Sequence, residues 1–190
     1  MSSHHIVREK QEPALLVLGL DNFPEEMLGQ LLEWSPTVIA TAQTAENLVS
    51  RGIKIDWIIT DGADEILQSD VKLMSCGECN LSDAALEFLA DNEYSAVNII
   101  TEELKLEDYG HFAHKINLVI FNGHEKIYPI VSGFSKWKQA GETVKILDEA
   151  DDLVLNGLKK INSKQYQTTG DGFFTICFHR PYIFIAEDVF

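Results

Sequence analysis

The amino-acid sequence predicts an α/β protein, in which a parallel-sheet α/β N-terminal domain is followed by a smaller all-β, sandwich-like C-terminal domain. In the first two thirds of the chain, five short apolar runs rich in β-branched residues alternate with helical patterns, as is typical of βα units. From residue 125 onward, short β-type runs follow one another between glycine, proline, asparagine and aspartate. We therefore expect a flexible lead-in over 1–12, an α/β domain over 13–126 and a β domain over 127–190.

Local signals set the expected helices and strands. Pro24 and the two glutamates after it begin a helix, because proline fits the first helical turn and acidic side chains favour the helix dipole there. Phe112, Ile116 and Val119 keep helical spacing, so a further helix is expected ahead of the glycine at 123. The expected strands are 14–20, 37–41, 56–60, 71–75 and 96–100, then 126–131, 143–147, 152–157, 172–178 and 182–187, and the expected helices are 24–34, 44–51, 84–92 and 112–122.

Composition narrows the class of protein. With 15 basic and 30 acidic residues the net charge is -15, which disfavours binding to nucleic acid or to an anionic membrane. No apolar run is as long as a membrane span, and the first residues lack the apolar core of a secretory signal. Three cysteines, an odd number, favour free thiols in a reducing compartment. We expect a cytoplasmic protein with a small-molecule ligand.

Cys76 and Cys79 form a C-x-x-C motif. No second such pair lies at the spacing of a zinc site, and the motif does not directly begin the expected helix. The simpler interpretation is a loop at the end of a strand with two small residues, and metal or redox use is the alternative.

Polar side chains follow the expected parallel strands, whose carboxyl ends share one edge of a sheet. Asp61 comes directly after strand 56–60, and Asp64 and Glu65 come shortly after it. Ligands of open α/β sheets bind at that edge, and carboxylates suit Mg²⁺, which commonly accompanies phosphates. The alternative is that these are ordinary polar loops of an acidic chain. The full set is Asp21, Asn22, Thr41, Gln43, Asp61, Asp64, Glu65, Glu78, Asn80, Thr101, Glu102 and Glu103.

His111 and His114 are three residues apart, so on a helix they share one face, with Asn117 next along it. A zinc pair and a set of packing or surface side chains are both compatible with this spacing. Lys115 is the nearest basic residue for a phosphate, and a solvated surface lysine is the alternative.

With these elements in order, the chain resembles the thiamine pyrophosphokinase family over roughly residues 14–130. GIKIDWII followed by TDGADE resembles the family's G-I-K-P-D segment and the strand ending in GDFDS. GECNLSDAALEFL resembles the K-D-x-T-D segment, and YGHFAHKINL resembles G-G-R-x-D-H-x-x-x-N, with His114 on the family's histidine. The resemblance implies a nucleotide-binding α/β domain, a thiamine-binding β domain and a homodimer. It also implies Mg²⁺-dependent transfer of a diphosphate from ATP to thiamine, which gives thiamine diphosphate and AMP.

If the chain has the activity of this family, roles follow for individual residues, those of the acids from their position at the strand ends and those of His114 and Asn117 from the motif alignment. Mg²⁺ would be held by Asp61, Asp64 and Glu78, and the catalytic carboxylates would be Asp61, Asp64 and Glu65. Contacts to nucleotide or substrate are implied for Gln43, Thr44, Thr101, His111, His114 and Asn117. The chain departs from the family where paired glycines are replaced by Gln43 and Thr44, and where Leu81 replaces an acid. Two alternatives stay open, namely a non-catalytic protein that binds a nucleotide or thiamine-like heterocycle, and diphosphate transfer to another alcohol such as a pterin.

Overall fold

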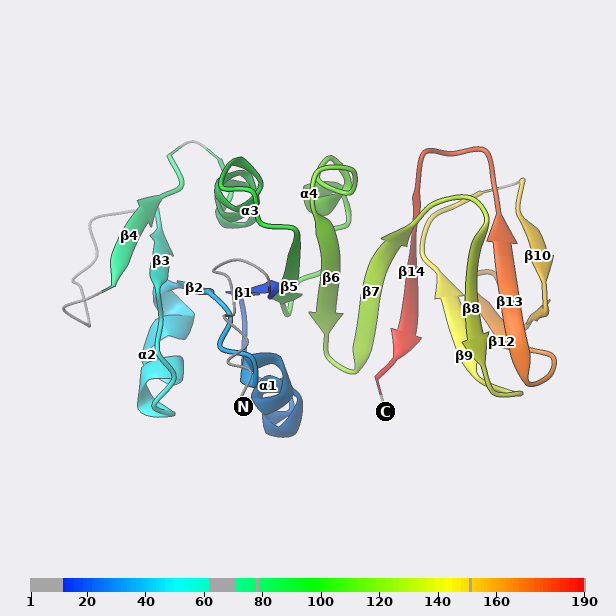
Figure 1. Cartoon of the computed structure of the whole chain (residues 1–190), viewed down its shortest axis with the longest axis horizontal. Helices are drawn as coiled ribbons and strands as arrows, with labels where there is room; N and C mark the ends of the chain where they lie inside the picture. The colour runs from blue at the N-terminus through cyan, green and yellow to red at the C-terminus, as the bar shows by residue number, and fades with distance from the viewer. Residues whose placement is uncertain (1–11, 62–70, 78, 151, 190) are drawn as a thin grey trace, which may run out of the picture. The chain divides into compact units, whose positions relative to one another are not determined.

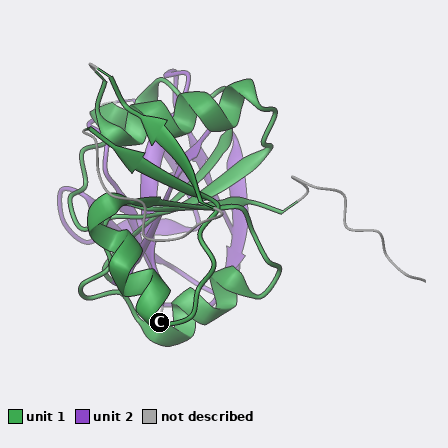
Figure 2. Ribbon diagram, turned by 90° about the vertical axis from the view of Figure 1, so that its left-hand side faces the viewer, with its two compact units in different colours: residues 1–123 green, residues 124–190 purple. Residues whose placement is uncertain are grey.

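A computed structural model of the chain describes residues 12–61, 71–77, 79–150 and 152–189. The protein has a mixed α/β fold and divides into two compact units, residues 1–123 and 124–190 (Figure 2). The boundary expected from the sequence was residue 126, and the expected lead-in over 1–12 falls, except for Glu12, outside the described residues. Within the described ranges, no helix has the length and apolar character needed to cross a membrane.

The strands of unit 1 form a parallel sheet in the order β6-β5-β1-β2-β3-β4. Most of these strands are nearly continuous apolar runs, as expected where helices cover both faces of a sheet. Figure 1 shows α1 and α2 on one face and α3 and α4 on the other. The elements are β1 (Ala14–Val17), α1 (Glu25–Leu32), β2 (Val38–Thr41), α2 (Ala42–Ser50), β3 (Trp57–Thr60), β4 (Lys72–Ser75), α3 (Leu81–Asp91), β5 (Ala96–Ile100), α4 (Glu107–Gly110) and β6 (Asn117–Asn122).

The order of the strands reverses at β1. The chain builds β2, β3 and β4 outward on one side of β1 and then returns to place β5 and β6 on the other side. Since βα crossovers are right-handed, this reversal also moves the helices to the opposite face of the sheet. The carboxyl ends of β1 and β5 therefore border a topological switch point, which is where open α/β sheets bind ligands.

Both faces of the sheet are sealed by apolar side chains. On one face, Leu15 and Val17 of β1 belong to a buried cluster with Leu28 of α1 and Leu48 of α2. On the other face, the ring of Phe88 in α3 lies 4.6 Å from that of Trp57 in β3, centroid to centroid. This packing fixes the strand ends and the starts of α2 and α3 relative to one another within unit 1.

The helix expected over 112–122 is wrong. The structure has only the short helix α4, then turns, and then strand β6, which pairs in parallel with β5 from Asn117 to Phe121. A short apolar run cannot distinguish a buried strand from a helix by spacing alone. Here the run NLVIF completes the sheet, and the hydrogen bonds to β5 outweigh the coincidental helical spacing of Phe112, Ile116 and Val119.

Unit 2 consists of two antiparallel sheets, ordered β11-β12-β9-β14-β7 and β10-β13-β8. Both sheets contribute to one buried apolar cluster, for example Phe174 from the smaller sheet and Val144 and Ile185 from the larger one. The strands β8, β11 and β12 were not expected, because their sequences are rich in lysine and glutamine. The strands are β7 (Glu125–Ile130), β8 (Phe134–Lys138), β9 (Thr143–Ile146), β10 (Val154–Asn156), β11 (Leu158–Lys160), β12 (Gln165–Thr168), β13 (Gly172–Cys177) and β14 (Ile183–Asp188).

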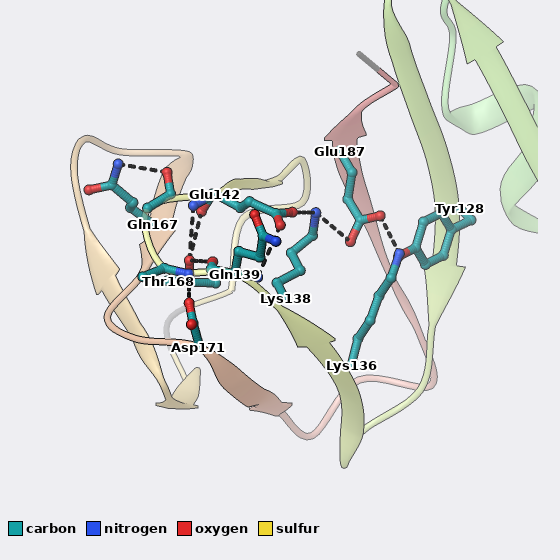
Figure 3. Close-up of polar contacts among 11 residues, drawn as sticks. Tyr128, Lys136, Lys138, Gln139, Glu142, Gln167, Thr168, Asp171 and Glu187 are labelled. Carbon is teal, nitrogen blue, oxygen red and sulfur yellow. Dashed lines mark hydrogen bonds and ion pairs between the residues drawn. The ribbon is translucent and has the colours of Figure 1, made fainter.

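A group of charged side chains lies between the sheets of unit 2 (Figure 3). Glu187 of β14 has a side chain only 5% exposed, and one of its carboxylate oxygens is paired with the ammonium group of Lys136 on β8. The Nζ atom of Lys138 lies 3.9 Å from the other oxygen, Oε1, and 2.5 Å from an oxygen of Glu142. The hydroxyl of Tyr128 also faces Glu187, and burial together with that negative charge raises the pKa of Tyr128.

Candidate functional site

A pocket of about 530 Å³ lies at the carboxyl edge of the unit 1 sheet, within the usual size range of small-molecule sites. It takes lining residues from the ends of β1, β2, β3, β4 and β5, and so it includes the switch point between β1 and β5. We call it the carboxyl-edge pocket. Its lining residues are Leu18, Gly19, Thr41, Gln43, Asp61, Cys76, Cys79, Asn80, Leu81, Ser82, Thr101, Glu102, Glu103, Lys105, Asp108 and Tyr109.

The start of helix α2 is held against this pocket by a capping box. The hydroxyl of Thr41 accepts a hydrogen bond from the backbone N–H of Thr44 at 3.2 Å, and the hydroxyl of Thr44 accepts one from the N–H of Thr41 at 3.1 Å. The Thr44 hydroxyl also lies 3.0 Å from the carbonyl oxygen of Val17, at the end of β1. Thr44 therefore anchors the helix to the sheet, while the exposed side chain of Gln43 lines the carboxyl-edge pocket.

The start of helix α3 borders the same pocket. Its N-cap Asn80 accepts hydrogen bonds through Oδ1 from the backbone N–H of Asp83 at 2.7 Å and from the hydroxyl of Ser82 at 2.8 Å. Each helix N-terminus carries a partial positive charge that favours anions. Two such termini, from α2 and α3, therefore lie beside carboxylates in one pocket.

Carboxylates dominate the charge of the pocket. Asp61, Glu102, Glu103 and Asp108 line it, against one lysine, Lys105. One oxygen of Glu102 accepts a hydrogen bond from the backbone N–H of Asp21, and Glu103 pairs with Lys105 at 3.3 Å. A phosphate group without a bound cation would therefore be repelled by the net negative charge of this pocket.

The pocket offers hard oxygen donors of the kind that Mg²⁺ binds. Among the residues whose structure is described, no three acidic, histidine or cysteine side chains cluster as a complete metal centre. Mg²⁺ seldom needs one, because it keeps several waters and is commonly bound through one or two carboxylates together with substrate phosphates. Asp61 and Glu103, both exposed at the pocket, fit that pattern. Three further acids of the expected site, Asp64, Glu65 and Glu78, lie outside the described residues.

The wall beside Thr101 contains a buried phenol. Tyr109 is 2% exposed and hydrogen-bonds to the side chain of Thr101, and its burial raises the pKa of the phenol to about 12. In the unfolded chain a tyrosine ionises near pH 10. The folded state thus holds Tyr109 in its neutral, hydrogen-bonding form well above neutral pH.

Tyr109 is expected to make the protein less stable at alkaline pH. Because its folded pKa is raised, its contribution is fully present below about pH 10 and is lost as the pH rises toward about 12, with an upper bound of about 2–3 kcal/mol. Tyr109→Phe should therefore show a smaller fall in the free energy of unfolding between about pH 9 and pH 12, measured by urea titration. Tyr182→Phe, a half-buried tyrosine of unit 2, is the matched control, and an equal fall in both variants would contradict the assignment.

The structure does not bring the histidine segment into the pocket. Helix α4 ends at Gly110, so His111, His114 and Asn117 do not share a helix face. His111 lies 3.6 Å from a carboxylate oxygen of Asp83, between Nε2 and Oδ1. His114 is exposed, and Asn117 begins β6 at the amino edge of the sheet, the opposite edge from the pocket.

The pocket thus joins seven of the edge residues expected from the sequence, with Thr44 directly behind it; the seven are Thr41, Gln43, Asp61, Asn80, Thr101, Glu102 and Glu103. It also includes Cys76 and Cys79, which were interpreted as an ordinary loop, and Asp108 and Tyr109, which were not singled out. The sequence signals for the cysteines were their C-x-x-C spacing and their position after a strand. Asp108 and Tyr109 lie in the short helix α4, which was not expected from the sequence.

Comparison with solved structures shows that the chain has the fold of thiamine pyrophosphokinases, which confirms the resemblance at the level of the fold. Thiamine pyrophosphokinase from Bacillus subtilis is 13% identical, with 94% of this chain and 99% of that chain covered and a TM-score of 0.63. A probable thiamine pyrophosphokinase from Staphylococcus saprophyticus is 11% identical (93% and 98% covered, TM-score 0.67), and the enzyme from Candida albicans is 10% identical (94% and 90% covered, TM-score 0.61). No protein-family model and no curated protein matches the sequence.

Proposed function

We propose that this protein, which shares the fold of thiamine pyrophosphokinases, binds a magnesium–nucleotide complex in the carboxyl-edge pocket of unit 1. One observation carries the proposal. The pocket lies at the switch point of the sheet and combines exposed carboxylates with the N-termini of two helices. Carboxylates attract the cation and helix N-termini attract phosphates, so the two halves of one metal–phosphate ligand each meet a complementary group.

The charge of the pocket makes the metal essential in this proposal. The lining carries four carboxylates and one lysine, so a nucleotide without a cation would be repelled. A divalent cation between Asp61 and the phosphates turns that repulsion into attraction, because the cation becomes the largest local charge. Binding of ATP should therefore depend on Mg²⁺ rather than merely improve with it.

A second candidate function is transfer of a diphosphate from ATP to thiamine. It is favoured by the likeness to thiamine pyrophosphokinases, which spans nine tenths or more of both chains. Such a transfer depends mainly on positioning and on neutralising charge. In this candidate Asp61 holds the metal together with Asp64 and Glu78, and the acceptor is an alcohol.

Isothermal titration calorimetry tests the first proposal directly. ATP is titrated into the full-length protein with Mg²⁺ present and again with Mg²⁺ removed by a chelator. Binding only in the presence of Mg²⁺ is the expected result. Absence of binding in both conditions, or binding of equal strength in both, would overturn the proposal.

The second candidate is tested by release of AMP. The protein is incubated with Mg²⁺ and ATP, alone, with thiamine, and with a pterin alcohol. AMP that appears only with thiamine supports transfer to thiamine, and AMP that appears only with the pterin assigns a different acceptor. No AMP in a preparation that binds Mg²⁺–ATP would remove the transferase candidate and leave a binding protein.

A further inference from the structure

Two cysteines stand in the wall of the carboxyl-edge pocket. Cys76 directly follows β4 and is 8% exposed, whereas Cys79, which precedes the N-cap of α3, is exposed. Both thiols are free and both line the pocket. The pair therefore combines one thiol that solvent reagents can reach with a second, protected thiol three residues away.

A backbone hydrogen bond already holds the two cysteines close to each other. The N–H of Cys79 donates to the carbonyl oxygen of Cys76 at 3.1 Å, and Gly77 has a φ of +61°, which glycine adopts without strain. A turn with this hydrogen bond brings its first and last Cα atoms within about 7 Å. Disulfides join Cα atoms about 4.4–6.8 Å apart. The backbone separation of the two cysteines is thus compatible with a disulfide.

A closed metal centre is the other use of a C-x-x-C pair, but it needs further ligands. Structural zinc sites have four protein ligands, and in the ranges with described coordinates no third cysteine, histidine or acid clusters with the two thiols. The described residues therefore contain a pair of thiols in the pocket wall, at a backbone spacing that is compatible with a disulfide.

We propose that Cys76 and Cys79 form a reversible disulfide that regulates ligand binding in the carboxyl-edge pocket. The thiolate of Cys79 attacks a sulfur of a small-molecule disulfide, which forms a mixed disulfide and releases one small thiol. The thiolate of Cys76 then attacks the Cys79 sulfur and releases the second small thiol. Two protein thiols are oxidised to one disulfide while the small disulfide is reduced to two thiols, and a dithiol reductant reverses the reaction.

The disulfide would change the pocket because Cys79 directly precedes a helix cap. Asn80, the next residue, lines the pocket and caps α3 through its bonds to Ser82 and Asp83. A disulfide draws the two sulfurs to about 2 Å from each other directly before this cap. It thereby displaces lining atoms at the start of α3, where the phosphates are proposed to bind, so the oxidised pocket should bind its ligand more weakly. This regulatory half rests on the proposed nucleotide binding, whereas formation of the disulfide does not.

The first experiment measures the disulfide alone. Full-length protein is incubated with oxidised glutathione, then alkylated and analysed by peptide mass spectrometry. We expect an intramolecular Cys76–Cys79 link, with Cys177 left alkylated, and reversal by dithiothreitol. Cys177→Ser should behave like the original protein, and Cys79→Ser, at an exposed position, should form no link. If Cys76 and Cys79 both remain alkylated, or persist only as glutathione adducts, the proposal is overturned.

The second experiment compares the affinity of the reduced and the oxidised protein for Mg²⁺–ATP by calorimetry. Oxidation should weaken binding by a factor in the ~5- to 150-fold range that is typical of coupled sites. Oxidised glutathione should leave the affinity of Cys79→Ser unaltered. An unchanged affinity in protein that carries the disulfide would overturn the regulatory half. Failure of the reduced protein to bind Mg²⁺–ATP would instead count against the proposed function, and the disulfide result would still stand.

Discussion

Replacing Glu187 by alanine is expected to destabilise unit 2 by about 1.5–3 kcal/mol, because it removes a buried carboxylate that two lysines, Lys136 and Lys138, share. Lys136 would lose a direct ion pair, and Lys138, whose side chain is only 11% exposed, would keep only its contact with Glu142. The hydroxyl of Tyr128 would lose the carboxylate that it faces. Each loss leaves a partly buried polar or charged group with fewer partners than it has now.

The measurement is chemical denaturation combined with hydrogen exchange of the amides in β8 and β14, which reports the stability of unit 2 locally. Glu187→Gln and Glu142→Gln form a matched pair, with the same substitution at a buried and at a more exposed carboxylate of one cluster. Glu142→Gln, at the more exposed carboxylate, should lower the free energy of unfolding by about 1 kcal/mol or less. Glu187→Gln, at the buried carboxylate, should lower it clearly more. Equal effects, or a cost below about 1 kcal/mol for Glu187→Ala, would show that this cluster does not stabilise the two sheets.

Asp61→Asn is expected to have the largest effect on ligand binding. Asp61 comes directly after β3 and lines the carboxyl-edge pocket, and asparagine keeps its size while removing its charge. Even groups that only support a metal ligand typically cost ~10- to 100-fold in metal affinity when they are lost. The affinity for Mg²⁺–ATP should fall at least this far.

Titrations with and without Mg²⁺ test whether the charge of Asp61 acts through the metal. In the absence of Mg²⁺, Asp61→Asn should bind ATP no more weakly than the original protein, because one repelling charge is gone. Asp91→Asn, the same substitution at an exposed position near the far end of α3, is the control and should change neither titration. If Asp61→Asn leaves the Mg²⁺–ATP affinity unchanged, Asp61 is not the residue that holds the cation.

Much of the fold of unit 1 was predictable from short-range patterns. The buried strands β1, β2, β3 and β5 are recognisable in the sequence as apolar runs. The polar residues after them mark where each strand ends. Gly52 and the acids after Pro24 likewise mark helix boundaries. These signals are local, because they depend on the period of burial and on the backbone preferences of individual residues.

The predictions that failed concern strands that are defined by pairing with distant parts of the chain. NLVIF was assigned to a helix because its period is ambiguous over so short a run, and only pairing with β5 makes it a strand. The polar strands β8, β11 and β12 escaped notice because their lysines and glutamines have no local β signal. Lys136 and Lys138 look like surface residues in the sequence, yet they meet the buried Glu187 across two sheets. The dimer, the cytoplasmic location and the roles of individual site residues stay predictions.

The sequence by itself determined the fold class, the positions of the principal strands and the acidic character of one sheet edge, since each follows from neighbours along the chain. Only the tertiary structure decided which of those edge residues meet. The order of the parallel strands joins Gln43, Asp61 and Thr101 in one pocket with two cysteines, and the direction of β6 sends Asn117 to the opposite edge. Strand order and direction depend on crossover connections and long-range hydrogen bonds, which no local pattern encodes.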